Sequence, residues 1–190
     1  MNLIAGLGNP GPRYKNSRHN IGFTVISLLS EKLGVRLLDQ KFHSINTAID
    51  YKGKKAILLC PLTYMNLSGK SIKACAEFYQ IPSKDILIVH DDLDLSMGQL
   101  KIVSHSGSGG HKGVQSIIDY LGNTDFSRVK MGIGRPLFEE TLENYVLSPF
   151  YEEQRDEAIR MNKFAVLACQ LFILDGLESV MRQINEKKRR

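Results

Sequence analysis

Short apolar runs alternate with helical segments along most of this chain, and that alternation constrains the fold more than any other feature of the sequence. Buried strands are expected at residues 3–8, 42–49, 54–61, 85–94, 98–105 and 128–134. Helices are expected at residues 21–33, 68–80, 114–122 and 152–176. Strands that alternate with helices favour an α/β fold, with a mixed, mainly parallel sheet and helices on both faces.

Nothing in the sequence divides the chain into separate parts. It contains no internal repeat, low-complexity tract or linker, so residues 1–190 are expected to form a single domain. Residues 136–149 are interpreted as a loop that leads to the last helix and moves as a lid.

The composition is that of a soluble globular protein, with 43% hydrophobic and 24% charged residues. No uninterrupted apolar run reaches the roughly 18 residues of a membrane span, so no membrane partner is expected. The first seven residues lack the basic start and long apolar stretch of a secretory signal, which favours a cytoplasmic location. Cys60, Cys75 and Cys169 show no C-x-x-C spacing, and we expect reduced, mostly buried thiols.

The formal net charge of +5 favours a polyanionic partner, because lysine and arginine release counterions from phosphates. Part of this excess is the tail "KKRR" at residues 187–190. The tail has two interpretations: a solvated helix end whose cations complement the helix dipole, or a segment that binds RNA.

The stretch "GLGNPG" matches the dinucleotide-binding spacing G-x-G-x-x-G, but its context does not. In a dinucleotide site the helix starts within the glycines, whereas Pro10 and Pro12 disfavour helix here and the helical pattern resumes only near Asn20. We therefore expect this loop to hold Asn9 and His19 in a cleft at the carboxyl end of the first strand.

His19 and Asp91 are the leading candidates for catalysis. Asp91 follows the central apolar run and could accept a hydrogen bond from one imidazole nitrogen of His19, which leaves the other nitrogen as a general base toward water. The alternative is a structural or merely exposed histidine.

The cluster "HDDLD" at residues 90–94 also suggests a site for a hard cation such as Mg²⁺. Strand alternation would place Asp92 and Asp94 on the side opposite Asp91, which argues against one metal cage. Turn and capping roles for Asp92 and Asp94 are favoured, and no metal is expected.

Two further segments carry polar candidates. Asn66 precedes a helix, where it would serve either as an N-cap or as an amide that holds a carbonyl or the attacking water. The glycine-rich "SGSGGHKG" resembles a phosphate cradle, but His111 precedes Lys112 where a P-loop needs glycine. This segment is either a mobile gate over the cleft or a plain flexible turn.

Five segments in order resemble the motifs of bacterial peptidyl-tRNA hydrolases. They are "GLGNPGPRYKNSRHNIG", "PLTYMNLSGKS", "VHDDLDLSMGQLK", "GSGGHKG" and "RVKMGIGRP". The resemblance implies a three-layer domain with a twisted mixed sheet, which cleaves the ester between a peptide and the 3′ end of tRNA. It also implies a monomer that needs neither metal nor organic cofactor.

The same resemblance implies roles for individual residues. His19 matches the catalytic base and Asp91 the carboxylate that orients it, and His111 matches a histidine of the gate that helps to hold substrate. The remaining candidates for contact with substrate are Asn9, Tyr14, Tyr64, Asn66 and Lys112, and those for contact with tRNA are Lys101, Lys130 and Arg135.

Lys112 departs from the family, which commonly has asparagine at this place. Lysine only donates hydrogen bonds, so the acceptor role of the amide is absent here or supplied elsewhere. We hypothesise that Lys112 contacts the end of the tRNA by its charge. Two rivals remain open from the residues alone: an RNA-binding module without chemistry, and a dinucleotide-dependent oxidoreductase.

Overall fold

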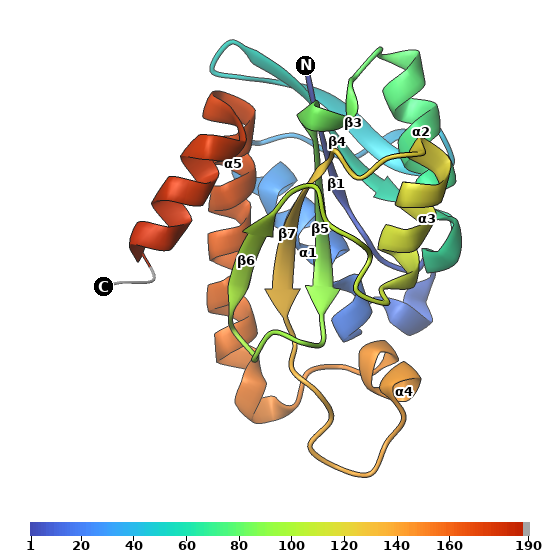
Figure 1. Ribbon diagram of the computed structural model, residues 1–190, viewed down its shortest axis with the longest axis vertical. Helices are drawn as coiled ribbons and strands as arrows, with labels where there is room; N and C mark the ends of the chain where they lie inside the picture. Colours follow the sequence, from blue (N-terminus) through green and yellow to red (C-terminus); the bar gives the residue numbers. More distant parts are fainter. Residues whose placement is uncertain (188–190) are drawn as a thin grey trace.

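The fold is a seven-stranded sheet between two layers of helices (Figure 1). The computed structural model describes the backbone of residues 1–187 and the side chains of residues 1–184, so the side chains of the basic tail 187–190 lie outside the described residues. The strands are β1 (Asn2–Gly6), β2 (Asp39–Lys41), β3 (Ser44–Tyr51), β4 (Lys54–Pro61), β5 (Ile86–Asp92), β6 (Leu100–Val103) and β7 (Ser127–Gly132).

The strand order is β2-β3-β4-β1-β5-β7-β6. The four central strands β4, β1, β5 and β7 run parallel, whereas β2, β3 and β6 join the sheet through antiparallel pairs. The predicted α/β fold with a mixed, mainly parallel sheet is therefore confirmed. The carboxyl ends of β1 and β5 lie side by side, and this edge of the sheet carries the polar candidates.

Helices α1 (Ile21–Lys32) and α5 (Arg155–Lys187) pack together on one face of the sheet, and α2 (Ser68–Phe78) and α3 (Lys112–Leu121) pack together on the other. Residues of β1 alternate between two hydrophobic cores. Ile4 packs on the side of α1 and α5, whereas Leu3 and Ala5 pack on the side of α2 and α3. This alternation follows from the period of two in a strand, and it explains why Leu3, Ile4 and Ala5 are apolar without interruption.

Among the α-helices and β-strands of the described residues, two short ones were not predicted from the sequence pattern. Residues 136–149, interpreted as a loop, contain helix α4 (Leu142–Leu147), which is capped by the Thr141 side chain. The missed strand β2 consists of three exposed polar residues, so it has no apolar signal. Both elements are too short for a periodic pattern to develop.

The last helix is longer than predicted and is interrupted at Gly176. That residue has φ 77° and ψ −172°, a conformation open to glycine because it has no Cβ. By length and composition alone the helical segment Glu152–Ile184 could cross a membrane, but 56% of its most apolar window is buried inside the molecule. Met161, Ala165 and Phe172 of this helix belong to the core beneath the sheet, as expected of a core helix.

Candidate active site

A cleft of about 820 Å³ opens at the carboxyl edge of the sheet. It lies between the loop after β1, the end of β5, the start of α3, the turn before α2, and α4. Nine residues predicted for the site line this cleft, namely Asn9, Tyr14, His19, Tyr64, Asn66, Asp91, His111, Lys112 and Arg135. Lys101 and Lys130 are not among its lining residues.

The glycines of the opening motif allow helix α1 to pack directly on the end of β1. A Cβ on Gly6 would lie 2.1 Å from the carbonyl oxygen of Gly22, and a Cβ on Gly22 would lie 2.4 Å from the backbone nitrogen of Leu7. Helix α1 begins only at Ile21, so its N-terminus does not lie within the glycines as a dinucleotide site requires. The motif therefore serves close packing, and this packing places the following loop over the ends of β1 and β5.

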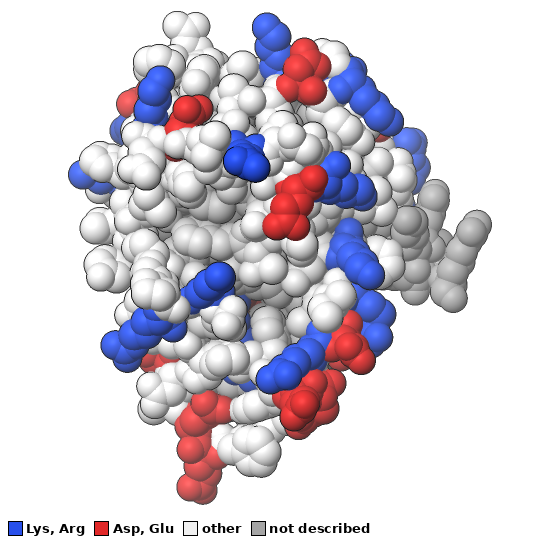
Figure 2. Space-filling model, turned by 180° about the vertical axis from the view of Figure 1, so that it is seen from behind, with Lys and Arg blue, Asp and Glu red and all other residues white. Residues whose placement is uncertain are grey.

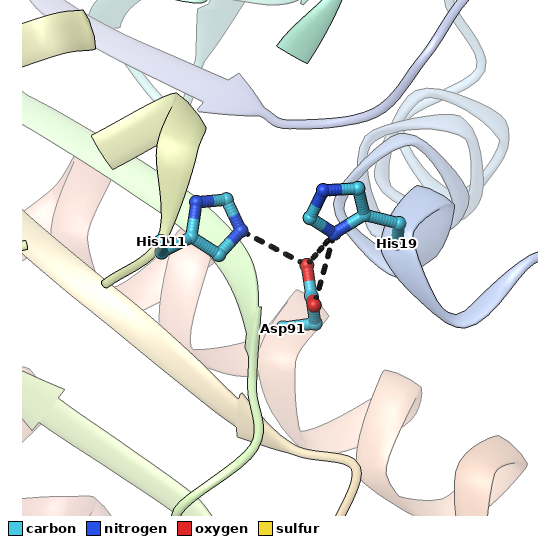
Figure 3. Close-up of side chains that lie close together, drawn as sticks. All are labelled: His19, Asp91 and His111. Atoms are coloured by element: carbon cyan, nitrogen blue, oxygen red, sulfur yellow. Dashed lines mark hydrogen bonds and ion pairs between the residues drawn. The ribbon is translucent and has the colours of Figure 1, made fainter. Parts of the chain in front are cut away.

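His19 and Asp91 meet in the cleft (Figure 3). Nδ1 of His19 lies 2.8 and 3.0 Å from the two carboxylate oxygens of Asp91, close enough for Nδ1–H to donate to the carboxylate. The His19 side chain is 12% exposed and that of Asp91 is 2% exposed. The geometry fixes the imidazole ring and leaves Nε2 of His19 as the nitrogen available to a bound water.

The two groups shift each other's pKa. Burial by itself would lower the pKa of His19, but the negative charge of Asp91 and its hydrogen bond raise that pKa above its ordinary value, with Lys112 opposing. Burial would raise the pKa of Asp91, yet the facing His19 and His111 rings hold it well below its usual range. Asp91 is therefore ionised throughout the physiological pH range.

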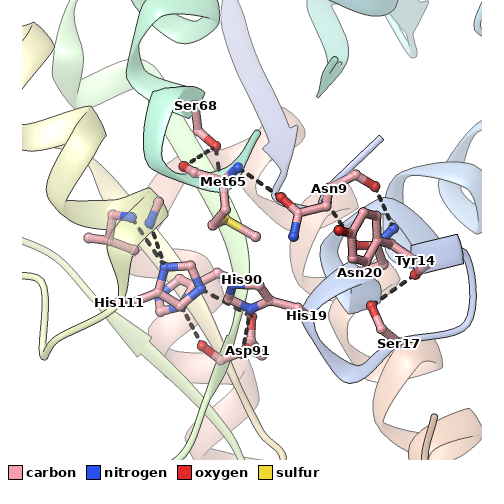
Figure 4. A network of polar contacts seen from close by, with 12 residues as sticks. Asn9, Tyr14, Ser17, His19, Asn20, Met65, Ser68, His90, Asp91 and His111 are labelled. Carbon is pink, nitrogen blue, oxygen red and sulfur yellow. Dashed lines mark hydrogen bonds and ion pairs between the residues drawn. The ribbon is translucent and has the colours of Figure 1, made fainter. Parts of the chain in front are cut away.

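His111 also donates to Asp91 and at the same time caps helix α3 (Figure 4). Its Nε2 lies 3.1 Å from Oδ1 of Asp91, and its Nδ1 accepts from the backbone N–H groups of Gly113 and Val114 at 3.1 and 3.2 Å. Because Nδ1 accepts two hydrogen bonds, the ring proton is on Nε2. The predicted gate histidine is therefore turned onto the carboxylate, at the first turn of a helix.

His19, Asp91 and His111 also form a group that could hold a metal ion, with one ligand atom of each within 4.8 Å of the others. A metal ligand needs a free lone pair, whereas Nε2 of His111 carries the proton that Asp91 accepts. The arrangement thus fits a hydrogen-bonded network better than a metal site.

The side chain of Asn9 is held in one orientation. Its Oδ1 accepts from the backbone N–H of Met65 at 2.8 Å, so its NH₂ group is left to face the cleft. Asn20 clamps the backbone of the same residue: it accepts from the N–H of Asn9 at 2.8 Å and donates to its carbonyl at 2.9 Å. The sequence predicted Asn20 only as the place near which the helical pattern resumes, and no pattern in the sequence shows this contact across the loop.

The rim of the cleft carries the remaining predicted residues. Asn66, Tyr64 and Lys112 are exposed and Tyr14 is half-buried. The alternative that Asn66 is a helix N-cap is wrong, because helix α2 has Leu67 at that position, without a side-chain cap. Asn66 instead lies one residue earlier, in the short 3-10 helix Met65–Leu67, where its amide borders the cleft.

The other polar residues of "HDDLD" have structural partners. His90 is buried, and Nδ1–H donates to the backbone carbonyl of Asp91 at 2.6 Å. Burial, together with the neighbouring His111, holds the pKa of His90 well below its ordinary value, so this ring stays neutral. Oδ1 of Asp92 accepts from the backbone N–H groups of Asp94 and Leu95, which is the predicted turn role.

The cations predicted to contact tRNA are only partly free. Nζ of Lys130 lies 2.6 Å from Oδ2 of Asp92, and Nη2 of Arg135 lies 2.6 Å from Oδ1 of Asp94. Lys101 is exposed and stands opposite Lys130 across the β6–β7 pair. Seen from behind, the molecule has scattered Lys and Arg side chains, with Asp or Glu beside several of them (Figure 2).

One wall of the cleft is a helix within residues 136–149, which the sequence analysis interpreted as a loop. Leu142, Val146 and Leu147 of α4 line it, together with Glu143, and we call these four residues the α4 wall. The signal that could have found it is the Thr141 cap before a short apolar segment, which is weak in isolation.

The three cysteines are poor candidates for a nucleophile. All three are free and buried, as predicted. Burial raises the pKa of Cys60, Cys75 and Cys169 to about 12, so no reactive thiolate forms at neutral pH. None of them lines the cleft.

Comparison with known proteins shows one consistent similarity. A family model described as peptidyl-tRNA hydrolase matches residues 3–190. The chain is 38% identical over 187 residues to the peptidyl-tRNA hydrolase of Bacillus subtilis, covering 98% of this chain and 100% of that protein. It is 43% identical over 188 residues to that of Caldanaerobacter subterraneus, covering 97% and 100%. The crystal structure of peptidyl-tRNA hydrolase from Acinetobacter baumannii matches with a TM-score of 0.90 at 36% identity, covering 97% of this chain and 94% of the other.

Proposed function

This chain belongs to the peptidyl-tRNA hydrolase family and is a hydrolase of peptidyl-tRNA, and we propose that it cleaves its substrate with water activated by His19. The bond broken is the ester between the carboxyl end of the peptide and the 3′-terminal ribose of the tRNA. The observation that carries this proposal is the contact of His19 Nδ1 with both oxygens of Asp91, which leaves Nε2 free at the cleft.

In the first step, Nε2 of His19 takes a proton from water as the water oxygen attacks the ester carbonyl. The imidazolium that forms is stabilised by the Asp91 carboxylate, and general-base assistance of this kind contributes roughly 100- to 10,000-fold in rate. The tetrahedral intermediate then expels the ribose oxygen, which recovers the proton from His19. A free peptide carboxylate and a free tRNA hydroxyl are the products.

Amide donors complete the site. The NH₂ of Asn9 has a fixed direction into the cleft, and the amide of Asn66 borders it, so both can hold the peptide carbonyl, the attacking water or the developing oxyanion. Loss of one oxyanion donor typically costs roughly 100- to 1,000-fold in rate. An alternative route lets the ribose 2′-hydroxyl assist the movement of the proton.

The outer cleft would hold the RNA. Lys112 and Arg135 line it and are exposed, and we assign to Lys112 a contact by charge with the phosphates at the end of the tRNA. Lys101 and Lys130 would extend this basic track along the acceptor stem. The enzyme is expected to act as a monomer in the cytoplasm, without metal or cofactor.

The experiment that tests the proposed function compares blocked with unblocked substrate. N-acetyl-aminoacyl-tRNA should release free tRNA, whereas the same aminoacyl-tRNA with its amino group unblocked should be cleaved far more slowly.

His19→Ala should abolish turnover and leave tRNA binding largely intact, and EDTA should have no effect. Near-normal hydrolysis by His19→Ala would refute the assignment of the base.

A further inference from the structure

A buried cation directly precedes His19 in the chain. The Arg18 side chain is 0% exposed, and its polar partners are carbonyls and one amide rather than carboxylates, within the part of the chain whose side chains are described. Burial of a charge costs free energy unless its surroundings replace the lost water. The surroundings of Arg18 must therefore be well defined.

Those surroundings consist of three aromatic rings and three oxygens. The guanidinium carbon lies 3.9 Å from the ring centre of Tyr145, 4.4 Å from that of Tyr151 and 5.5 Å from that of Phe150. Nη1 donates to the carbonyls of Tyr145 and Ser148 at 3.1 and 3.3 Å, and Nη2 donates to Oε1 of Gln154 at 3.3 Å. Tyr145 belongs to the last turn of helix α4 and Ser148 follows that helix directly, so both carbonyls lie at the negative end of the helix dipole, which favours a cation.

All of these partners come from residues 145–154. The backbone reinforces the attachment, because the N–H of Arg18 donates to the carbonyl of Ser148 at 3.0 Å and Ser17 pairs with Pro149. Residues 145–154 continue directly from the α4 wall. One side chain thus fastens this wall to the short helix Arg18–Asn20, which also carries His19.

We propose that Arg18 is a positioning residue that holds the α4 wall at a fixed distance from His19 and so determines how tightly the acyl group of the substrate is bound. This inference rests on the proposed function. Arg18 does not touch the reacting atoms, because it is wholly buried. The wall presents Leu142, Val146 and Leu147 to the cleft, so an apolar acyl side chain gains most from it, and a glycyl group gains least.

The test is a comparison of two acyl groups on the same tRNA. Arg18→Lys keeps the charge but loses the planar guanidinium group, which stacks on the rings and donates to several carbonyls at once. It should raise the KM for N-acetyl-leucyl-tRNA about tenfold and that for N-acetyl-glycyl-tRNA less than about twofold. The pH midpoint of kcat should not change, because the contact between His19 and Asp91 is independent of the wall.

Arg155→Lys is the matched control, because Arg155 is exposed and pairs only loosely with Glu152 at 3.9 Å. It should leave both KM values unchanged. Equal losses on the two substrates, or a shifted pH midpoint, would overturn the proposal. If Arg18→Lys shows no cooperative thermal unfolding, Tyr151→Leu takes its place, because it removes one stacking ring from Arg18. It should raise the KM for N-acetyl-leucyl-tRNA by a smaller factor than Arg18→Lys, again with little change for N-acetyl-glycyl-tRNA. Equal increases in the two KM values would overturn the proposal in this variant too. A wild-type enzyme that cleaves neither substrate would instead refute the proposed function.

Discussion

Nδ1 of His19 contacts both carboxylate oxygens of Asp91, although 72 residues separate them in the sequence. His19 lies in the short 3-10 helix Arg18–Asn20 before α1, and Asp91 lies near the end of β5, the strand beside β1. Glycine-mediated packing of α1 on β1 is what brings the two elements together, since any side chain at Gly22 would collide with the backbone of Leu7 and Val89. The site thus depends on backbone packing as much as on its polar residues.

Asp91→Asn should lower kcat by roughly 100- to 10,000-fold. The amide cannot stabilise the imidazolium of His19, and it offers an NH₂ group where a carboxylate accepted from two rings. Single-turnover hydrolysis of N-acetyl-aminoacyl-tRNA measures the loss, and circular dichroism checks that the fold is retained. A variant with at least half of the wild-type rate would contradict the assigned role of Asp91.

The pH dependence of kcat/KM should follow His19. The base must be unprotonated, so activity should rise with pH through a midpoint above 6.5, because Asp91 raises the pKa of His19. Below that midpoint the imidazolium predominates and the rate falls. In Asp91→Asn the residual activity should have its midpoint at lower pH, since burial then acts without the opposing charge. An unchanged midpoint in this variant would mean that Asp91 does not set the pKa of the base.

Lys112→Ala should have two separable effects. Loss of a phosphate contact should weaken tRNA binding and reduce the slope of log Kd against log salt concentration by about one. Loss of the nearby cation should raise the pKa of His19 further and move the pH midpoint upward. Lys32→Ala is the control, because Lys32 is exposed at the C-terminal end of α1 and does not line the cleft. A salt slope equal to that of wild type would exclude a phosphate contact for Lys112.

Asn20→Ala should reduce activity although Asn20 itself does not line the cleft. It removes the two hydrogen bonds that clamp the backbone of Asn9, at a cost of about 1–3 kcal/mol in the free energy of unfolding. The NH₂ of Asn9 then loses its fixed direction, and kcat should fall by at least about tenfold. Thermal unfolding and steady-state kinetics measure the two effects, with the exposed Asn16→Ala as control. Unchanged kcat would show that the clamp serves stability alone.

Gly22→Ala should destabilise the fold by at least about 2 kcal/mol, because the new methyl group would lie 2.4 Å from the nitrogen of Leu7 and 2.5 Å from the carbonyl oxygen of Val89. Backbone atoms cannot move aside as a flexible side chain can. Chemical denaturation measures the change, and Gly107→Ala, where a Cβ meets nothing within 4 Å, should be nearly neutral. Equal stability of the two variants would contradict the packing account.

The framework of the molecule could be predicted from the sequence because most of its strands and helices have a clear apolar pattern. The runs at residues 54–61 and 85–94 became β4 and β5, and the cleft follows because the ends of parallel strands meet at one edge. Asn9, His19 and Asp91 were predicted there for that reason.

Other features depend on contacts that no local pattern contains. An arginine is ordinarily exposed, and Arg18 is buried because Tyr145 and Tyr151, which are distant in the sequence, pack against it. The direction of the Asn9 amide depends on Met65, and the tautomer of His111 depends on the first turn of α3. Short elements such as α4 are also missed by prediction from the sequence, since six residues are too few to show a hydrophobic period.

The three sealed thiols bear on how the enzyme behaves under oxidative stress. Peroxides attack cysteine as the anion, and that species is not formed here at cellular pH. If hydrolysis proceeds at His19 as proposed, oxidants that inactivate cysteine-dependent hydrolases should therefore leave this activity intact.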